Sequence, residues 1–129
     1  MPIETIGGTV KLPDGTPVPL SKAVKVGDLL MLSGQLGFGP DGRIVEGGIE
    51  AQTKQCIENA KAVLAEAGSD LSQVVKASIW LTDTADFAAF NRAYAEYFPS
   101  HPPARSAVCS GLMVPGAVVE IEFIAHQPA

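Results

Sequence analysis

The chain has 129 residues, of which 47% are hydrophobic and 18% charged, a size and composition that predict a single domain over residues 1–129. The net charge of −5 and the pI of about 4.9 argue against nucleic-acid binding, which needs clustered basic side chains. The N-terminus does not have the pattern of a signal peptide, and no apolar run approaches the roughly 20 residues of a membrane helix, so we expect a cytoplasmic protein with no membrane partner.

The first third of the chain predicts strands joined by turns. Residues 3 to 10 favour a short edge strand, and the proline-rich residues 11 to 22 predict a loop. Residues 23 to 34 predict a strand pair or one bent strand with a glycine turn in its middle. Within them, the apolar residues 29 to 32 indicate a fully buried run.

The middle of the chain predicts two helices separated by a strand. Apolar residues at helical spacing predict a helix from about 48 to 67. Residues 74 to 81 are β-branched or apolar at nearly every position, which is typical of a strand covered on both faces. Asp83 and Thr84 are predicted to cap a second helix that Pro99 ends.

The second helix presents aromatic residues on one face, and two strands joined by a turn then end the chain. Helical spacing assigns these aromatic residues to the core, although Phe87 could also form the wall of a cleft. The order ββαβαββ, with local hairpins at both ends, predicts an α+β fold in which both helices pack on one face of a mixed sheet.

The last two strands carry charged residues in otherwise apolar sequence. Side-chain alternation puts Arg105, Ala107 and Cys109 on one face of the first strand, and Glu120 and Glu122 on one face of the second. The planar guanidinium of an arginine suits a carboxylate, because it presents two parallel donors and keeps its charge. The alternative is that Arg105 pairs with one of these glutamates and merely neutralises buried charge.

Either glutamate could act as a general base, and the other would then belong to a solvated strand face. Cys109 is interpreted as packing, as is usual for a cysteine in an apolar strand. The two cysteines have no CxxC spacing and the two histidines are isolated, so we expect no disulfide and no metal site.

The motifs PARSAV and VEIEFIA, together with DLLMLSGQ and DFAAFNRAYAEYF upstream, resemble the RidA family, also called YjgF or UK114. The resemblance extends from Leu20 to Ala125. It implies a chorismate-mutase-like fold and a homotrimer with clefts between subunits. It also implies hydrolysis of reactive enamines and imines, such as 2-aminoacrylate, to keto acids and ammonia without a cofactor.

The same resemblance implies a role for individual residues. Arg105 would bind the substrate carboxylate and Glu120 would orient water. Two positions depart from the pattern of the family, since Leu20 stands where deaminases of the best-known type have tyrosine and Ala107 where many have cysteine. The other substrate-binding positions that the resemblance implies are Ser33 and Gly34 on a loop of the cleft, and Phe87 and Asn91 as pocket lining.

Three hypotheses follow for the function. The first is a deaminase of small enamines and imines that carry a carboxylate, and the second is a pathway-specific deaminase of a larger amino-substituted acid that Leu20 contacts. The third is a module that binds or senses a small carboxylic metabolite without turnover. The apolar surplus of the chain predicts a subunit interface. The resemblance implies that this interface closes a trimer, in which Arg105 and Glu120 of one chain would meet Phe87 or the Ser33 loop of a neighbour.

Overall fold

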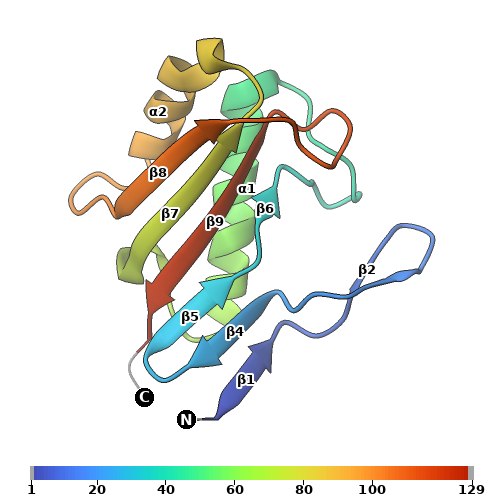
Figure 1. Ribbon diagram of the computed structural model, residues 1–129, viewed down its shortest axis with the longest axis vertical. Helices are drawn as coiled ribbons and strands as arrows, with labels where there is room; N and C mark the ends of the chain where they lie inside the picture. The colour runs from blue at the N-terminus through green and yellow to red at the C-terminus, as the bar shows by residue number, and fades with distance from the viewer. Residues whose placement is uncertain (1, 128–129) are drawn as a thin grey trace.

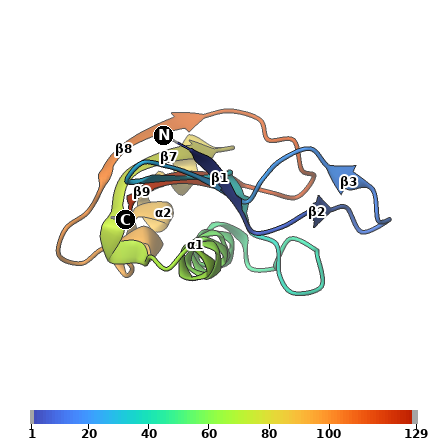
Figure 2. The same ribbon diagram turned by 90° about the horizontal axis from the view of Figure 1, so that it is seen from below.

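The computed structural model describes residues 2–127, which form a seven-stranded mixed sheet with α1 and α2 packed on one face (Figures 1 and 2). This is the expected α+β architecture. A two-stranded ribbon, β2–β3, extends away from the sheet (Figure 2). In chain order the elements are β1 (Ile3–Ile6), β2 (Val10–Lys11), β3 (Pro17–Val18), β4 (Ala23–Val26), β5 (Leu29–Leu32), β6 (Gln35–Leu36), α1 (Gly48–Glu66), the 3₁₀ helix η1 (Leu71–Gln73), β7 (Val74–Leu81), the 3₁₀ helix η2 (Thr84–Asp86), α2 (Phe87–Ala95), β8 (Ala104–Cys109) and β9 (Val119–His126).

The strand order is β1-β4-β5-β9-β7-β8, and β6 also pairs with β9. The expected edge strand is confirmed in β1, although it ends at Ile6 and not at residue 10, and the predicted loop at residues 11 to 22 contains β3, which pairs with β2. The expected strand pair is confirmed as the hairpin β4–β5, whose turn contains Gly27 at φ 58. The predicted fully buried run at residues 29 to 32 is wrong. Leu30 and Leu32 are buried, but Leu29 and Met31 point to the opposite face and are exposed, because helices cover this sheet on one side only.

The predicted C-terminal hairpin is also wrong. β8 pairs with β7 in parallel at the edge of the sheet, whereas β9 lies in the centre, antiparallel to both β5 and β7. The reason is that α2 returns the chain to the starting end of β7, so β8 runs in the same direction as β7. The inward residues of β9, Val119, Ile121, Phe123 and Ala125, are all 0% exposed, which only a central strand allows.

The two faces of the sheet differ in their environment. Ala77, Ile79 and Leu81 of β7 are buried beneath the helices, but Lys76, Ser78 and Trp80 on the other face are only half-buried. The expectation that β7 is covered on both faces is therefore not met within one chain. The helix-free face also carries Met31 and Ile124, which are neighbours in the register of β5 and β9.

Both helices lie where the sequence predicts them, but the second is shorter than predicted. The first is confirmed as α1, whereas α2 ends at Ala95 instead of reaching Pro99. The chain then turns and inserts Phe98 into the core, where its ring centroid lies 4.7 Å from that of Tyr94 and 6.0 Å from that of Phe123. Asp83 caps η2 through the backbone N–H of Ala85 rather than capping α2 itself. Neither helix combines the length and the apolarity that crossing a bilayer requires, within the residues described.

A buried glutamine fixes the start of β9. The side chain of Gln52, which is 4% exposed, donates to the carbonyl oxygen of Gly116 at 3.0 Å and accepts from the backbone N–H of Val118 at 2.9 Å. Gly37 packs closely against this residue, since a Cβ at position 37 would lie 3.1 Å from the Cα of Gln52. The first turns of α1 thus hold the loop that leads into β9 and position Glu120 two residues beyond it.

Candidate active site

Arg105 lies on the helix-covered face of the sheet, where three aromatic side chains of α2 contact its guanidinium. Its Cζ lies 5.1 Å from the ring centroid of Tyr94 and 5.6 Å from those of Phe87 and Phe90. Its Nη2 donates to the side-chain oxygen of Asn91 at 2.5 Å. Each ring contributes about 0.5 to 2 kcal/mol of cation–π attraction. The guanidinium is therefore held in one orientation before any ligand binds.

No carboxylate among residues 2–127 forms an ion pair with Arg105. A guanidinium has five N–H donors, and here Asn91 accepts from one of them. Burial raises the pKa of Tyr94 to about 12, an effect that the positive charge of Arg105 opposes, so the phenol stays neutral near pH 7. The local surroundings of Arg105 are thus aromatic and neutral, and its positive charge is not compensated within them.

The hypothesis that Arg105 pairs with Glu120 or Glu122 is wrong within the chain. Arg105 is in register with Ala77, which in turn pairs with Phe123, and both partners are buried on the helix face. Glu120 and Glu122 are in register with Trp80 and Ser78 and share the helix-free face, as side-chain alternation predicted. The arginine and the two glutamates are on opposite sides of the sheet.

Glu120 belongs to a second cluster, which the loop after β5 completes. A Cβ on Gly34 would overlap Oε2 of Glu120 and lie 3.1 Å from its Cδ, so the absence of a side chain at position 34 makes room for this carboxylate. The hydroxyl of Ser33 donates to the carbonyl oxygen of Ser21 at 2.5 Å, and the backbone N–H of Ser33 donates to the carbonyl oxygen of Lys22 at 2.9 Å. These bonds bring the exposed Leu20 next to the Ser33 loop.

The environment of Glu120 changes its acidity. Partial burial raises the pKa of this carboxyl above its usual range, and the like charge of Glu122 on the same strand face raises it further. A carboxylate with a raised pKa is a stronger base than one in water. Glu120 is therefore suited to accept a proton or to hydrogen-bond a water molecule.

The structure thus divides the predicted site residues into two clusters. Phe87 was expected to meet Arg105 of a neighbouring chain, but it contacts Arg105 of its own chain and is 43% exposed, so it is not a core residue. Sequence reasoning missed that Phe90 and Tyr94 contact Arg105, since their helical spacing indicated only that they are core residues. The first cluster contains Phe87, Asn91, Arg105 and Ala107, and the second contains Leu20, Ser33, Gly34 and Glu120.

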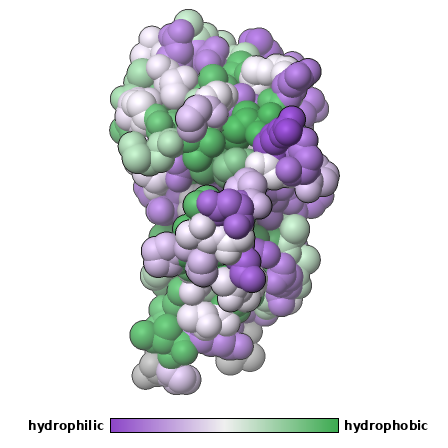
Figure 3. Space-filling model, turned by 90° about the vertical axis from the view of Figure 1, so that its right-hand side faces the viewer, coloured by the Kyte–Doolittle hydropathy of each residue, from purple (hydrophilic) through white to green (hydrophobic). Residues whose placement is uncertain are grey.

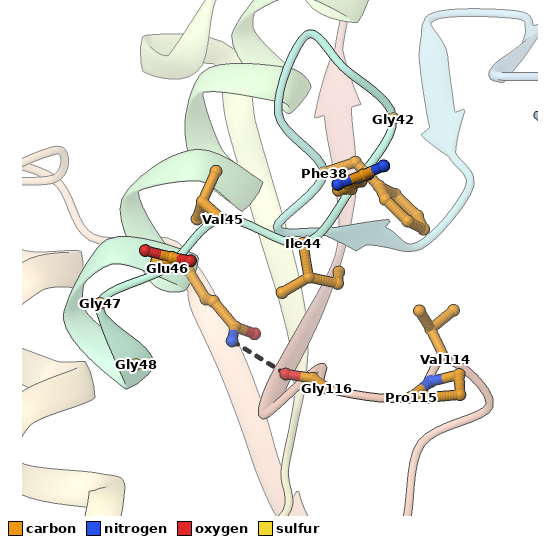
Figure 4. Close-up of a pocket in the computed structure, with 12 residues that line it drawn as sticks. Phe38, Gly42, Ile44, Val45, Glu46, Gly47, Gly48, Val114, Pro115 and Gly116 are labelled. Atoms are coloured by element: carbon orange, nitrogen blue, oxygen red, sulfur yellow. Dashed lines mark hydrogen bonds between the residues drawn. The ribbon is translucent and has the colours of Figure 1, made fainter.

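Two hollows lie on the surface. The smaller, of about 220 Å³, adjoins the first cluster, and it contains Cys109, which is exposed rather than packed as expected. The larger, of about 630 Å³, lies between the loop that precedes α1 and residues 114 to 116, where Gln52 bonds to Gly116 (Figure 4). No predicted site residue lines this larger hollow.

The side of the molecule that carries these loops shows an apolar area bordered by hydrophilic side chains (Figure 3). Hydrophilic residues also line the larger hollow, among them Arg43 and Glu46, both of which are exposed. Within residues 2–127 no group of three or more histidine, cysteine, aspartate or glutamate side chains could hold a metal ion.

A mixed sheet with two helices packed on one face is the α+β architecture of the chorismate-mutase-like class, which the chain shares with solved structures such as that of yeast Mmf1. Residues 15–127 match the family model described as Endoribonuclease L-PSP. The chain belongs to this family, which is also known as the Rid or YjgF/YER057c/UK114 family.

Relatives of known name agree with this assignment. The chain is 41% identical over 119 residues to the 3-aminoacrylate deaminase RutC of Acinetobacter baylyi, covering 89% of this chain and 94% of that protein. It is 44% identical over 108 residues to the chloroplastic Reactive Intermediate Deaminase A of Arabidopsis thaliana, covering 83% and 58% of the two chains. Its structure matches the crystal structure of RidA from an Antarctic Psychrobacter species with a TM-score of 0.83 and 40% identity, over 95% and 98% of the two chains.

The contact between Gly34 and Glu120 generates a prediction. Gly34→Ala should move the Glu120 carboxylate to another rotamer, because a methyl group would occupy the space of its Oε2 atom. We expect the crystal structure and the carboxyl ¹³C resonance of Glu120 to show the move. The free energy of unfolding should change by only about 1 kcal/mol, the cost of an unfavourable rotamer.

Gly111→Ala is the matched control, since no atom lies within 4 Å of a Cβ at that position, and it should leave the resonance of Glu120 unchanged. A Gly34→Ala structure in which Glu120 stays in place and the Ser33 loop moves would contradict the prediction.

Proposed function

We propose that this protein is a deaminase that hydrolyses small enamines and imines carrying a carboxylate to 2-keto acids and ammonia. The observation that carries the proposal is the guanidinium of Arg105, which is oriented by Asn91 and three rings and has no carboxylate partner among residues 2–127. A planar guanidinium prepared in this way binds a planar carboxylate through two parallel hydrogen bonds.

The names of two relatives support the reaction type. One is called a 3-aminoacrylate deaminase and the other a reactive intermediate deaminase. Aminoacrylates carry a carboxylate beside an enamine, so an arginine anchor and a nearby base are the groups that their hydrolysis requires. We infer the same reaction class for this chain.

The reaction needs little chemical machinery. The enamine takes a proton on carbon and becomes an iminium ion, that is, a protonated imine, and water then adds to the carbon of the C=N bond as it gives up a proton. The resulting carbinolamine collapses as the C–N bond breaks, which releases ammonia and leaves a keto group. Arg105 would hold the carboxylate and Glu120 would orient the water and accept its proton, so the proposal requires no cofactor.

Two copies of the chain are required to bring these groups together, because Arg105 and Glu120 lie on opposite faces of one sheet. We propose a homotrimer in which the first cluster of one subunit, with Arg105, meets the second cluster of the next subunit, with Glu120 and Ser33. The half-buried helix-free face, with Met31, Trp80 and Ile124, offers the apolar surface that such an assembly would cover.

The central test replaces the anchor. Arg105→Ala should abolish ammonia and keto acid formation in an assay coupled to an amino acid dehydratase or oxidase, and should weaken pyruvate binding by about 2 to 5 kcal/mol. Arg105→Lys should recover little, because an ammonium group does not fix the orientation of a carboxylate. Unchanged affinity for pyruvate in Arg105→Ala would remove the anchor role. Pyruvate binding by the wild-type protein without ammonia release above the spontaneous rate would favour the sensing module.

The second test uses pH. Glu120 must be deprotonated to act as a base, so turnover should fall as the pH drops through its raised pKa. Glu122→Gln removes the like charge and should shift this acid limb to lower pH with only a mild loss at neutral pH. Glu120→Gln should lower turnover by about 10²- to 10⁴-fold while pyruvate still binds. Equal losses in both variants would assign both carboxylates to structure.

The third test examines the shared cleft. Arg105→Ala and Glu120→Gln chains, each inactive alone, should regain activity after they are unfolded and refolded together. In a closed ring of three, every mixed trimer contains one intact site, so an equal mixture should reach about a quarter of the wild-type number of sites. A fully active monomer, measured by light scattering at assay concentration, would overturn the shared site.

A further inference from the structure

We propose that the small hollow beside Arg105 binds the apolar side chain of the substrate, so that imino acids with aliphatic chains of about leucine size are preferred. This inference rests on the proposed function, since it takes Arg105 as the carboxylate anchor. We call the hollow the side-chain pocket. It has a volume of about 220 Å³ and is lined by Leu81, Thr84, Phe87, Ala107, Val108 and Cys109.

The side-chain pocket lies in line with the anchor. Arg105, Ala107 and Cys109 share one face of β8, because they are in register with Ala77, Ile79 and Leu81, which are all buried on the helix face of β7. Since a strand rises about 3.3 Å per residue, position 107 lies about 7 Å from position 105, and position 109 about 13 Å. A ligand of a few carbon atoms held at Arg105 can therefore reach the pocket.

Phe87 joins the two parts of the site. Its ring contacts the guanidinium, with Cζ 5.6 Å from the ring centroid, and the same residue lines the side-chain pocket. Phe87 is 43% exposed and Val108 is 52% exposed, whereas Leu81 at the base of the pocket is 3% exposed. Apolar side chains that remain exposed around a buried base leave an apolar surface that a ligand can cover.

The lining determines the chemical class of the occupant. The lining residues include no acidic or basic side chain, and the hydroxyl of Thr84 is their only oxygen group outside the backbone. A second charge on the substrate would lose its hydration without gaining a partner. The volume lies below the roughly 300 to 1,000 Å³ of pockets for drug-sized ligands, which fits a short aliphatic chain.

Ala107 explains how such a chain would pass from the anchor to the pocket. It lies between Arg105 and Cys109 on the strand face, and a methyl side chain leaves the passage open. The larger hollow at residues 114 to 116 is a weaker candidate for the same role. Its lining includes the exposed charged residues Arg43 and Glu46, and it shares no residue with the first cluster around Arg105.

The test measures equilibrium binding of stable 2-keto acids to the assembled protein by calorimetry. Each methylene that leaves water strengthens binding by a factor of about four, so 4-methyl-2-oxopentanoate should bind at least about tenfold more tightly than pyruvate. 2-Oxopentanedioate, which has a second carboxylate in place of the apolar end, should lose this advantage. Equal affinities for the three acids would overturn the proposal.

Variants that fill the side-chain pocket locate the effect. Cys109→Leu and Thr84→Leu should reduce the affinity ratio of 4-methyl-2-oxopentanoate to pyruvate to near one. Ala85→Leu is the matched control, since Ala85 is the exposed neighbour of Thr84 in η2 and does not line the pocket, and it should keep the wild-type ratio. Light scattering confirms that each variant retains the wild-type mass before its affinities are compared.

The outcomes separate the two proposals. A wild-type protein that binds pyruvate with no gain from a longer chain overturns the side-chain pocket alone. A gain that survives in both filled variants also overturns it, because the chain must then bind elsewhere. A wild-type protein that binds none of the 2-keto acids overturns the anchor role of Arg105, and the side-chain pocket with it.

Discussion

The parallel pairing of β8 with β7 is the constraint on which the candidate site depends. It sets Arg105 level with Ala77, on the face that α2 covers, and so places the guanidinium over Phe87, Phe90 and Tyr94. An antiparallel hairpin of the last two strands would have removed β8 from the edge beside α2. The crossover through α2 therefore places Arg105 over this helix, whose aromatic face packs in the core and also contacts the guanidinium.

The same sheet keeps Arg105 apart from Glu120. Alternation along β9 directs Val119 and Ile121 into the core, so Glu120 between them must point to the helix-free face. Gln52 reinforces this arrangement by holding the backbone just before Glu120. Arg105 and Glu120 therefore lie on opposite faces of one chain, which is why the proposed site takes its groups from two copies.

The structure shows the surroundings of Ala107 and Leu20, the two positions at which the resemblance implies a departure from the pattern of the family. Ala107 lines the small hollow together with Thr84 and Cys109, and Leu20 is an exposed apolar side chain beside the Ser33 loop. Both changes exchange a polar or reactive group for an apolar one. Under the proposed function they would alter the surroundings of the substrate and leave Arg105 and Glu120 in place.

The sequence by itself determined the α+β class, the place of both helices, the β4–β5 hairpin and the sharing of one strand face by Glu120 and Glu122. These depend on local periodicity and turn residues, which are readable along the chain. Only the tertiary structure decided that β9 is central and β8 an edge strand, that Leu29 and Met31 are exposed, and that Arg105 and Glu120 lie on opposite faces. Strand order and pairing direction join residues distant in sequence, and no local pattern encodes which strand lies beside which.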